Sequence, residues 1–177
     1  MTKTAIITAS ENIFSQFSET CDRIDETAMF AKPGLKWSVA ENIRHMVIST
    51  NMTTLAYRLP KFIVKWIGGT PNRQSRSYEE LKEKYYKKLS EGGRASGRFV
   101  PKPIEVNYGK RKLVDSWNAS TAKYLSSLTA NRTDQDLDNY LARHPLLGRI
   151  TLRELCYFTI FHTEHHLKTI RELTQTP

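Results

Sequence analysis

The chain has 177 residues, of which 39% are hydrophobic and 25% charged, and its formal net charge at pH 7 is +9. This length and composition predict one globular domain over residues 1–177. No apolar run is long enough to span a bilayer, and two cysteines make no disulfide framework. The first residues lack a long apolar segment, so a secretory signal is not expected. We therefore expect a cytoplasmic protein without a membrane partner.

The excess positive charge lies in the middle third of the chain. Residues 58–112 hold 15 Lys+Arg and 5 Asp+Glu, whereas the two flanking thirds are nearly balanced. A basic band can hold nucleic acid, an anionic membrane or an acidic small molecule, and it can also be an ordinary solvated surface. Because no helix-turn-helix, zinc-finger or aromatic-rich RNA-binding motif accompanies it, nucleic acid is not the expected partner.

Two long helices are predicted in the first third. Apolar residues recur near a 3.6-residue period over residues 5–29, and "KPG" at 32–34 ends that pattern. Ser38 and Glu41 form the S-x-x-E signature of a capping box, which predicts a second helix over residues 39–59.

The basic middle third is more broken. Residues 61–76 are predicted to be irregular or to contain a short turn of helix, and "SYEELKEKYYKKLSEGG" is a short charged helix. Residues 92–110 are rich in Gly and Pro and read as a long connection, and a third long helix is predicted over 111–129. We interpret the basic segment as a long insertion between the second and third long helices.

The last helix has its own start signal. Residues 130–150 carry the turn signal "HPLLG", and Thr151 with Glu154 forms a second capping box, which predicts a helix over 152–174. No alternating strand pattern is evident. Four long amphipathic segments with one long crossover predict an all-α four-helix bundle, a fold that places metal and ligand sites in its core on facing helices.

Three histidines interrupt the apolar face of the last helix, in "HTEHH" at residues 162–166. Positions four apart on a helix are separated by about 40°, so His162 and His166 point the same way, in the H-x-x-x-H spacing used for metal chelation. His165 flanks the pair. The alternative is an incidental pair of ordinary histidines. Inward placement favours a ligand, because burying two unpartnered imidazoles is costly.

A third ligand is available on the second helix. His45 lies on a partly apolar face and, taken alone, is a core histidine satisfied by one or two hydrogen bonds. Facing His162 and His166 across the bundle, it completes a three-histidine site with open coordination positions, the pattern of catalytic metal sites. Glu41, one turn before His45, is a candidate general base, and its alternative role is only the capping box. His144 is interpreted as a turn residue.

Two stretches carry a family resemblance. "WSVAENIRHM", with its histidine seven residues after the Ser, and "HPLLGRITLRELCYFTIFHTEHHLKTI" resemble the DinB-like (YfiT-like) superfamily. The resemblance implies a four-helix bundle, often a homodimer, with a divalent metal bound by His45, His162 and His166. Zinc or nickel is typical, and imidazole also suits copper or iron better than magnesium or calcium. Relatives include low-molecular-weight thiol S-transferases and a thiol-dependent maleylpyruvate isomerase.

Three functions follow as hypotheses. The first is a divalent-metal-dependent enzyme, a hydrolase or a low-molecular-weight-thiol S-transferase, that activates water or a thiolate for a small-molecule substrate. The basic segment would attract an anionic thiol, with these candidate contacts: Arg73, Arg76, Arg94 and Arg98. The second is a non-catalytic binding module whose basic third contacts nucleic acid or an acidic partner. The third is a fold that keeps its histidines without metal, in which case His45 lies far from the other two or is satisfied by hydrogen bonds.

Overall fold

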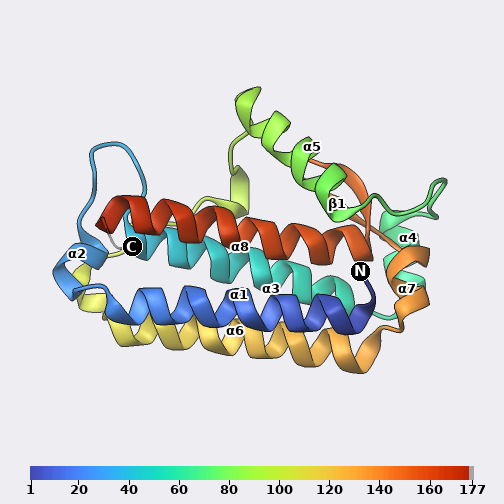
Figure 1. The fold of residues 1–177 in the computed structure, drawn as a ribbon, viewed down its shortest axis with the longest axis horizontal. Helices are drawn as coiled ribbons and strands as arrows, with labels where there is room; N and C mark the ends of the chain where they lie inside the picture. Colours follow the sequence, from blue (N-terminus) through green and yellow to red (C-terminus); the bar gives the residue numbers. More distant parts are fainter. Residues whose placement is uncertain (176–177) are drawn as a thin grey trace.

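The computed structural model describes residues 1–175, and four long helices lie side by side in it as a bundle (Figure 1). These helices are α1 (Lys3–Arg23), α3 (Val39–Arg58), α6 (Lys110–Asn131) and α8 (Leu152–Thr174). Helix α3 packs against α6 and α8, and α1 packs against the same two helices, which closes the ring. The all-α four-helix bundle predicted from the sequence is confirmed.

Shorter elements connect the long helices. They are α2 (Glu26–Phe30), α4 (Lys61–Gly68), α5 (Tyr78–Ser90), the 3₁₀ turns η1 (Gly97–Phe99) and η2 (Val106–Tyr108), α7 (Asp134–Asn139), and the strands β1 (Leu141–His144) and β2 (Gly148–Thr151). The long crossover between α3 and α6 contains α4, α5 and both 3₁₀ turns. Figure 1 shows α5 rising away from the bundle and α4 and α7 together at one end of it. Among residues 1–175, no helix combines the length and apolar character needed to cross a bilayer.

Both predicted capping boxes are present. At the start of α3, the Ser38 hydroxyl accepts from the Glu41 amide, and the Glu41 carboxylate accepts from the Ser38 amide. Thr151 and Glu154 make the same reciprocal pair at the start of α8. Because each box satisfies backbone N–H groups that the helix itself cannot, it sets where the helix begins. The two helices that carry the three histidines therefore start where the sequence predicts.

The prediction of one helix over residues 5–29 is wrong, because helix α1 ends at Arg23 and a second helix, α2, begins at Glu26. Ile24 is extended, and Asp25 begins α2 by accepting a hydrogen bond from the Thr27 amide at 2.8 Å. Both helices bury apolar side chains, Ile24 lies at the core between them, and Met29 is fully buried. The apolar pattern therefore continues across the break and hides it.

A short hairpin accompanies the helices, although no alternating strand pattern is evident in the sequence. Strands β1 and β2 form an antiparallel hairpin in which Leu141 lies opposite Thr151 and His144 lies opposite Gly148. Each strand has four residues, which is too few for an alternating pattern to stand out. The turn signal of "HPLLG" does mark the hairpin turn, where Nδ1 of His144 accepts from the amides of Leu146 and Leu147.

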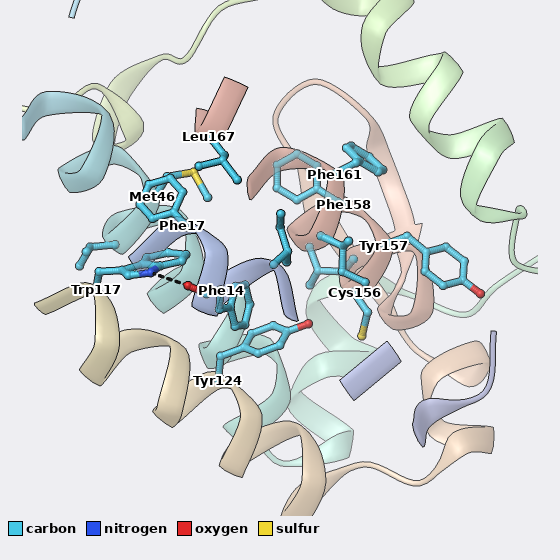
Figure 2. Close-up of a cluster of buried hydrophobic side chains, with 14 of the residues drawn as sticks. Phe14, Phe17, Met46, Trp117, Tyr124, Cys156, Tyr157, Phe158, Phe161 and Leu167 are labelled. Carbon is cyan, nitrogen blue, oxygen red and sulfur yellow. Dashed lines mark hydrogen bonds between the residues drawn. The ribbon is translucent and has the colours of Figure 1, made fainter. Parts of the chain in front are cut away.

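Aromatic side chains in the core pack the helices of the bundle against one another (Figure 2). Phe14 of α1 meets Trp117 of α6 edge-on at 5.4 Å between ring centroids, and it meets Tyr124 of α6 in the same way at 5.5 Å. The Trp117 indole N–H lies 3.5 Å from the Phe14 carbonyl oxygen to which it donates. Cys21 and Cys156 are buried in this core as free cysteines.

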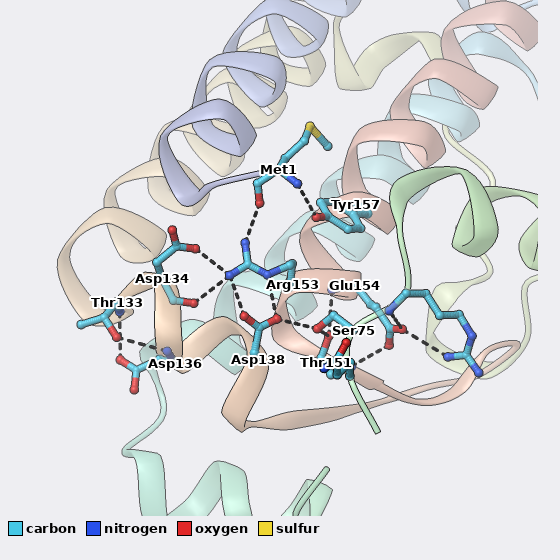
Figure 3. A network of polar contacts seen from close by, with 12 residues as sticks. Met1, Ser75, Thr133, Asp134, Asp136, Asp138, Thr151, Arg153, Glu154 and Tyr157 are labelled. Carbon is cyan, nitrogen blue, oxygen red and sulfur yellow. Dashed lines mark hydrogen bonds and ion pairs between the residues drawn. The ribbon is translucent and has the colours of Figure 1, made fainter. Parts of the chain in front are cut away.

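A polar network fastens α7 and the N-terminus to the start of α8 (Figure 3). Arg153 of α8 pairs with Asp134 at 2.6 Å and with Asp138 at 2.7 Å, and it donates to the Met1 carbonyl. The Met1 amine donates to the Tyr157 hydroxyl at 3.0 Å. These contacts hold the first turns of α8, the helix that carries two of the three histidines.

Candidate metal centre

Three imidazoles converge between α3 and α8. Nε2 of His162 lies 3.2 Å from Nε2 of His45 and 3.1 Å from Nε2 of His166. The ligand atoms of the three residues all lie within 4.8 Å of one another. With zinc–nitrogen bonds of about 2.0–2.1 Å, neighbouring nitrogens of a tetrahedral site are about 3.3 Å apart. The two measured distances, both from Nε2 of His162, therefore match the spacing of ligands on one metal ion.

The three side chains are buried and neutral. Their exposed fractions are 5% for His45, 4% for His162 and 6% for His166. Burial lowers the pKa of all three imidazoles, and the neighbouring histidines lower the pKa of His162 and His166 further, to well below the ordinary value. Neutral imidazole is the form that binds metal, because only it has a free lone pair.

Hydrogen bonds select which nitrogen of two histidines carries the lone pair. Nδ1 of His45 lies 2.7 Å from the carbonyl oxygen of Phe99, and Nδ1 of His166 lies 2.8 Å from Oδ1 of Asn42. Both oxygens can only accept, so each Nδ1 carries the proton and each Nε2 presents its lone pair to the centre. Such outer contacts orient the ligand histidines of metal sites.

The orientation of the Asn42 amide is itself set by α3. Its Nδ2 donates to the Ser38 carbonyl at 2.8 Å, which turns Oδ1 toward His166. Sequence reasoning missed Asn42, although its position three residues before His45 on the same helix is a usable signal. It also missed Phe99, which contributes a backbone carbonyl from η1 and therefore leaves no side-chain signal.

Without a cation, the three imidazoles cannot satisfy the hydrogen-bonding capacity of all three Nε2 atoms. Nε2 of His162 faces the lone pairs of two other nitrogens, and it carries at most one proton to share between them. A cation at the shared point would satisfy all three nitrogens together. The donor set therefore fits a divalent metal of borderline softness.

A cavity of about 820 Å³ adjoins the three histidines. The Trp37 ring lies 5.1 Å from the ring of His45, and the Phe158 ring stacks on His162 at 4.6 Å. The cations along the cavity are Lys36, Arg94 and Arg143, and none of the lining residues in the described part of the chain is acidic. Its other walls are mainly apolar side chains of α3, α4, the hairpin and α8. The site can thus receive a small molecule with an apolar body.

Glu41 is buried, and its contacts are those of the helix cap. Oε2 accepts from the Ser38 amide at 2.8 Å, and Oε1 lies 3.3 Å from Nζ of Lys32. Glu41 is absent from the residues that line the cavity. These contacts support its capping role, and its role as a general base stays a prediction.

The remaining histidines lie beside the cluster. His165 is half-buried, lines the cavity and stands with its ring 6.0 Å from that of Tyr86, so it flanks the pair as predicted. His144 caps the hairpin turn and packs against Phe158, with 4.2 Å between ring centroids. The candidate metal site thus contains three of the five histidines.

The arginines suggested for anion binding separate into two groups. Arg73 and Arg76 are paired with the fully buried carboxylate of Glu154, at 2.7 Å and 3.2 Å, and neither lines the cavity. Arg94 lines the cavity, whereas Arg98 is exposed outside it. The buried charge of Glu154 therefore accounts for the first two arginines.

Comparison with known proteins agrees with this architecture. A family model described as the DinB superfamily matches residues 11–170, a span that includes His45, His162 and His166. No curated protein and no solved structure matches the chain. The matched span contains all of α3 and nearly all of the four-helix bundle. The chain belongs to the DinB superfamily.

Proposed function

We propose that this protein is a divalent-metal-dependent enzyme, a hydrolase or a low-molecular-weight-thiol S-transferase, with zinc or nickel held by His45, His162 and His166. The observation that carries the proposal is the convergence of three buried, neutral Nε2 atoms beside a cavity. By analogy with the superfamily, the working form is a homodimer.

The residues of the chain have distinct tasks in this proposal. Three protein ligands leave coordination positions open, and a bound divalent ion lowers the pKa of water or of a thiol, so that a nucleophile is available at neutral pH. Phe99 and Asn42 orient His45 and His166 through their Nδ1 protons. The apolar walls of the cavity exclude water and hold the substrate body.

An anionic group on the substrate fits the charges around the cavity. Lys36, Arg94 and Arg143 line it without an acidic neighbour among the lining residues, and within residues 1–175 none of the three forms an ion pair with a carboxylate. A low-molecular-weight thiol with a carboxylate is one molecule of this kind. These cations support an anionic thiol as co-substrate.

The alternative of a non-catalytic binding module has less support. Part of the basic middle third is already neutralised inside the protein, since Arg73 and Arg76 pair with Glu154 and Lys82 pairs with Glu164. No nucleic-acid-binding motif accompanies the cations that remain.

The metal is tested on protein prepared without a histidine tag and exposed to zinc, nickel and manganese. Elemental analysis is expected to find about one zinc or nickel ion per chain. Metal at a hundred times its dissociation constant should raise the melting temperature by about 5–10 °C. His162→Ala should abolish both effects. His165→Ala is the matched control on the same helix and should keep them, and stoichiometric binding by His162→Ala would disprove the site.

The reaction is tested by a screen with the metal-loaded protein. Transfer to electrophilic substrates with several low-molecular-weight thiols is compared with hydrolysis of esters and amides without thiol. Turnover should require metal and disappear in His162→Ala. Thiol-dependent turnover identifies the transferase and thiol-independent turnover the hydrolase. Stoichiometric metal without any turnover would reject the enzymatic part of the proposal and leave the metal site standing.

A further inference from the structure

Helix α4 exposes large apolar side chains at one end of the bundle. Phe62 is 73% exposed and Trp66 is 85% exposed, and they lie four residues apart on one face of the helix. Ile67, beside Trp66, is 42% exposed. Two aromatic rings so fully exposed on a helix of eight residues mark an interaction site, because isolated apolar residues on a surface are common but adjacent large ones are not.

Helix α4, which exposes these side chains, is itself packed against the rest of the protein. Val64, on the opposite face of α4, is buried, and Gly68 packs so closely on β1 that a Cβ atom there would overlap the Leu141 carbonyl. Nε of Arg143 donates to the Ile67 carbonyl at 3.0 Å and closes the last turn. The inner face of α4 is therefore fixed on the hairpin, and the aromatic rings point outward because of that packing.

Basic residues lie on α4 and on the segments next to it. They are Arg58 at the end of α3, Lys61 and Lys65 on α4, Arg143 on β1, and Arg149 on β2, whose guanidinium lies beside Gly69. Lys61 pairs with Asp136 at 2.8 Å. In the rest of this basic rim, no ion pair with a carboxylate forms within residues 1–175. The apolar face thus has an unneutralised positive border.

We propose that this face docks the protein on an anionic membrane surface. Phe62 and Trp66 would enter the interfacial layer, which aromatic rings prefer, and the basic rim would contact anionic headgroups. The absence of a spanning helix among residues 1–175 does not bear on this mode, because the helix lies on the surface. The proposal departs from the sequence-based expectation of no membrane partner, which rested on segment length.

Charge selects the membrane over two other occupants. A second copy of the chain related by a two-fold axis would bring the same basic rim against itself, which is repulsive. Nucleic acid would satisfy the rim, but the aliphatic side chain of Ile67 would gain nothing from phosphates or bases. A lipid surface with anionic headgroups satisfies the rim and the apolar face together.

Docking in this way would bring the cavity close to the lipid. Val64 and Ile67 of α4 line the cavity, as does Leu55 of α3, which is 45% exposed. The cavity therefore opens next to the proposed docking face. The docking itself does not depend on the metal centre, so the His162→Ala variant should bind vesicles as the wild type does.

The test is co-sedimentation with vesicles of phosphatidylcholine alone and of phosphatidylcholine mixed with phosphatidylglycerol. We expect binding to the anionic vesicles that weakens as salt is added and is much weaker on the neutral ones. Arg58→Gln with Lys65→Gln should lower the affinity by roughly fivefold per residue. Phe62→Ser with Trp66→Ser should lower it by about tenfold or more.

Matched controls separate docking from general charge and hydrophobicity. Lys123→Gln removes an exposed cation from α6, and Val106→Ser removes an exposed apolar side chain from η2, and neither should change vesicle binding. The tryptophan emission should shift to the blue on anionic vesicles, and Trp66→Phe should abolish the shift. Unchanged melting temperatures confirm that the variants fold, since the replaced side chains are exposed.

Three outcomes would overturn the proposal. One is the absence of binding to anionic vesicles, and another is binding that survives Phe62→Ser with Trp66→Ser. The third is a different occupant, seen as a dimer that this double variant dissociates, or as salt-sensitive binding of DNA or RNA that it abolishes.

Discussion

The side-chain oxygen of Asn42 lies 2.8 Å from Nδ1 of His166, and the amide nitrogen of the same side chain donates to the Ser38 carbonyl. One residue thereby joins the capped start of α3 to a candidate ligand on α8. The contact crosses the bundle, and it selects Nε2 of His166 as the atom that faces the centre.

Removing this contact should weaken metal binding without removing a ligand. Asn42→Ala is expected to lower zinc or nickel affinity by about 10–100-fold, because the His166 ring loses its orientation and its fixed proton position. Competition with a chromophoric chelator measures the affinity. Asn51→Ala is the matched control, since Asn51 is on α3 as well but accepts from Ser120. Equal affinities for the wild type and Asn42→Ala would show that Asn42 does not orient the ligand.

Glu41→Gln separates the two roles considered for Glu41. Glutamine can complete a capping box as glutamate does, but it cannot act as a base. If Glu41 only caps the helix, the variant should keep its metal affinity and its turnover, and should lose less than about 1 kcal/mol of stability from its half-exposed partner Lys32. Turnover and denaturant titration are measured on the same preparation. A loss of turnover with unchanged metal content would assign Glu41 to the chemistry.

Stability should fall in mild acid because His144 must stay neutral. Burial lowers the pKa of His144 to about 4, and its Nδ1 accepts from the amides of Leu146 and Leu147. The unfolded chain takes up this proton below its ordinary pKa of about 6.5, so the contribution is complete above that pH and is lost as the pH falls toward 4. The group accounts for at most about 3 kcal/mol.

The control for the pH effect replaces His144 by an acceptor that does not titrate. In His144→Asn, the side-chain oxygen can still accept from the turn amides. Urea titrations of the metal-free protein give the free energy of unfolding at each pH. They are made from pH 7 to pH 4 in steps of about one pH unit. The wild type should lose more stability than the variant, and parallel curves would assign the acid sensitivity to other groups.

Glu154 should be among the most sensitive positions for stability. Its carboxylate is fully buried, receives both guanidinium nitrogens of Arg73 at 2.7 Å and 2.8 Å, and accepts from the backbone amides of Arg76 and Thr151. Burial would raise its pKa, but these hydrogen bonds outweigh burial and hold the pKa below the ordinary value. Glu154→Ala is expected to cost about 2–4 kcal/mol, because it removes the acceptor of the Arg76 and Thr151 amides and of the partly exposed Arg73 guanidinium.

Denaturant unfolding measures that cost against a surface pair on the same helix. Glu172 faces Lys168 at 3.8 Å with both side chains exposed. Glu172→Ala should therefore change stability by less than about 0.5 kcal/mol. Similar losses for the two variants would mean that Glu154 is not a buried anchor for the basic segment.

Local sequence signals predict much of the helical bundle. Ser38 with Glu41 and Thr151 with Glu154 predict the starts of α3 and α8, because a capping box depends on residues only three positions apart. Local sequence signals cannot distinguish two backbone structures that bury the same side chains. The break at Asp25 keeps the apolar pattern of one continuous helix, and the four-residue strands of the hairpin are too short to show alternation.

The spacing of His162 and His166 by itself determined that these two imidazoles share one face of a helix, since four residues make nearly one turn. Only the tertiary structure decided that His45, more than a hundred residues earlier, meets them, because that depends on how α3 packs on α8. It also decided that Phe99 and Asn42 select the lone pairs, and that Arg73 and Arg76 turn toward Glu154. A helical repeat fixes directions within one element, whereas contacts between elements depend on the packing of the whole chain.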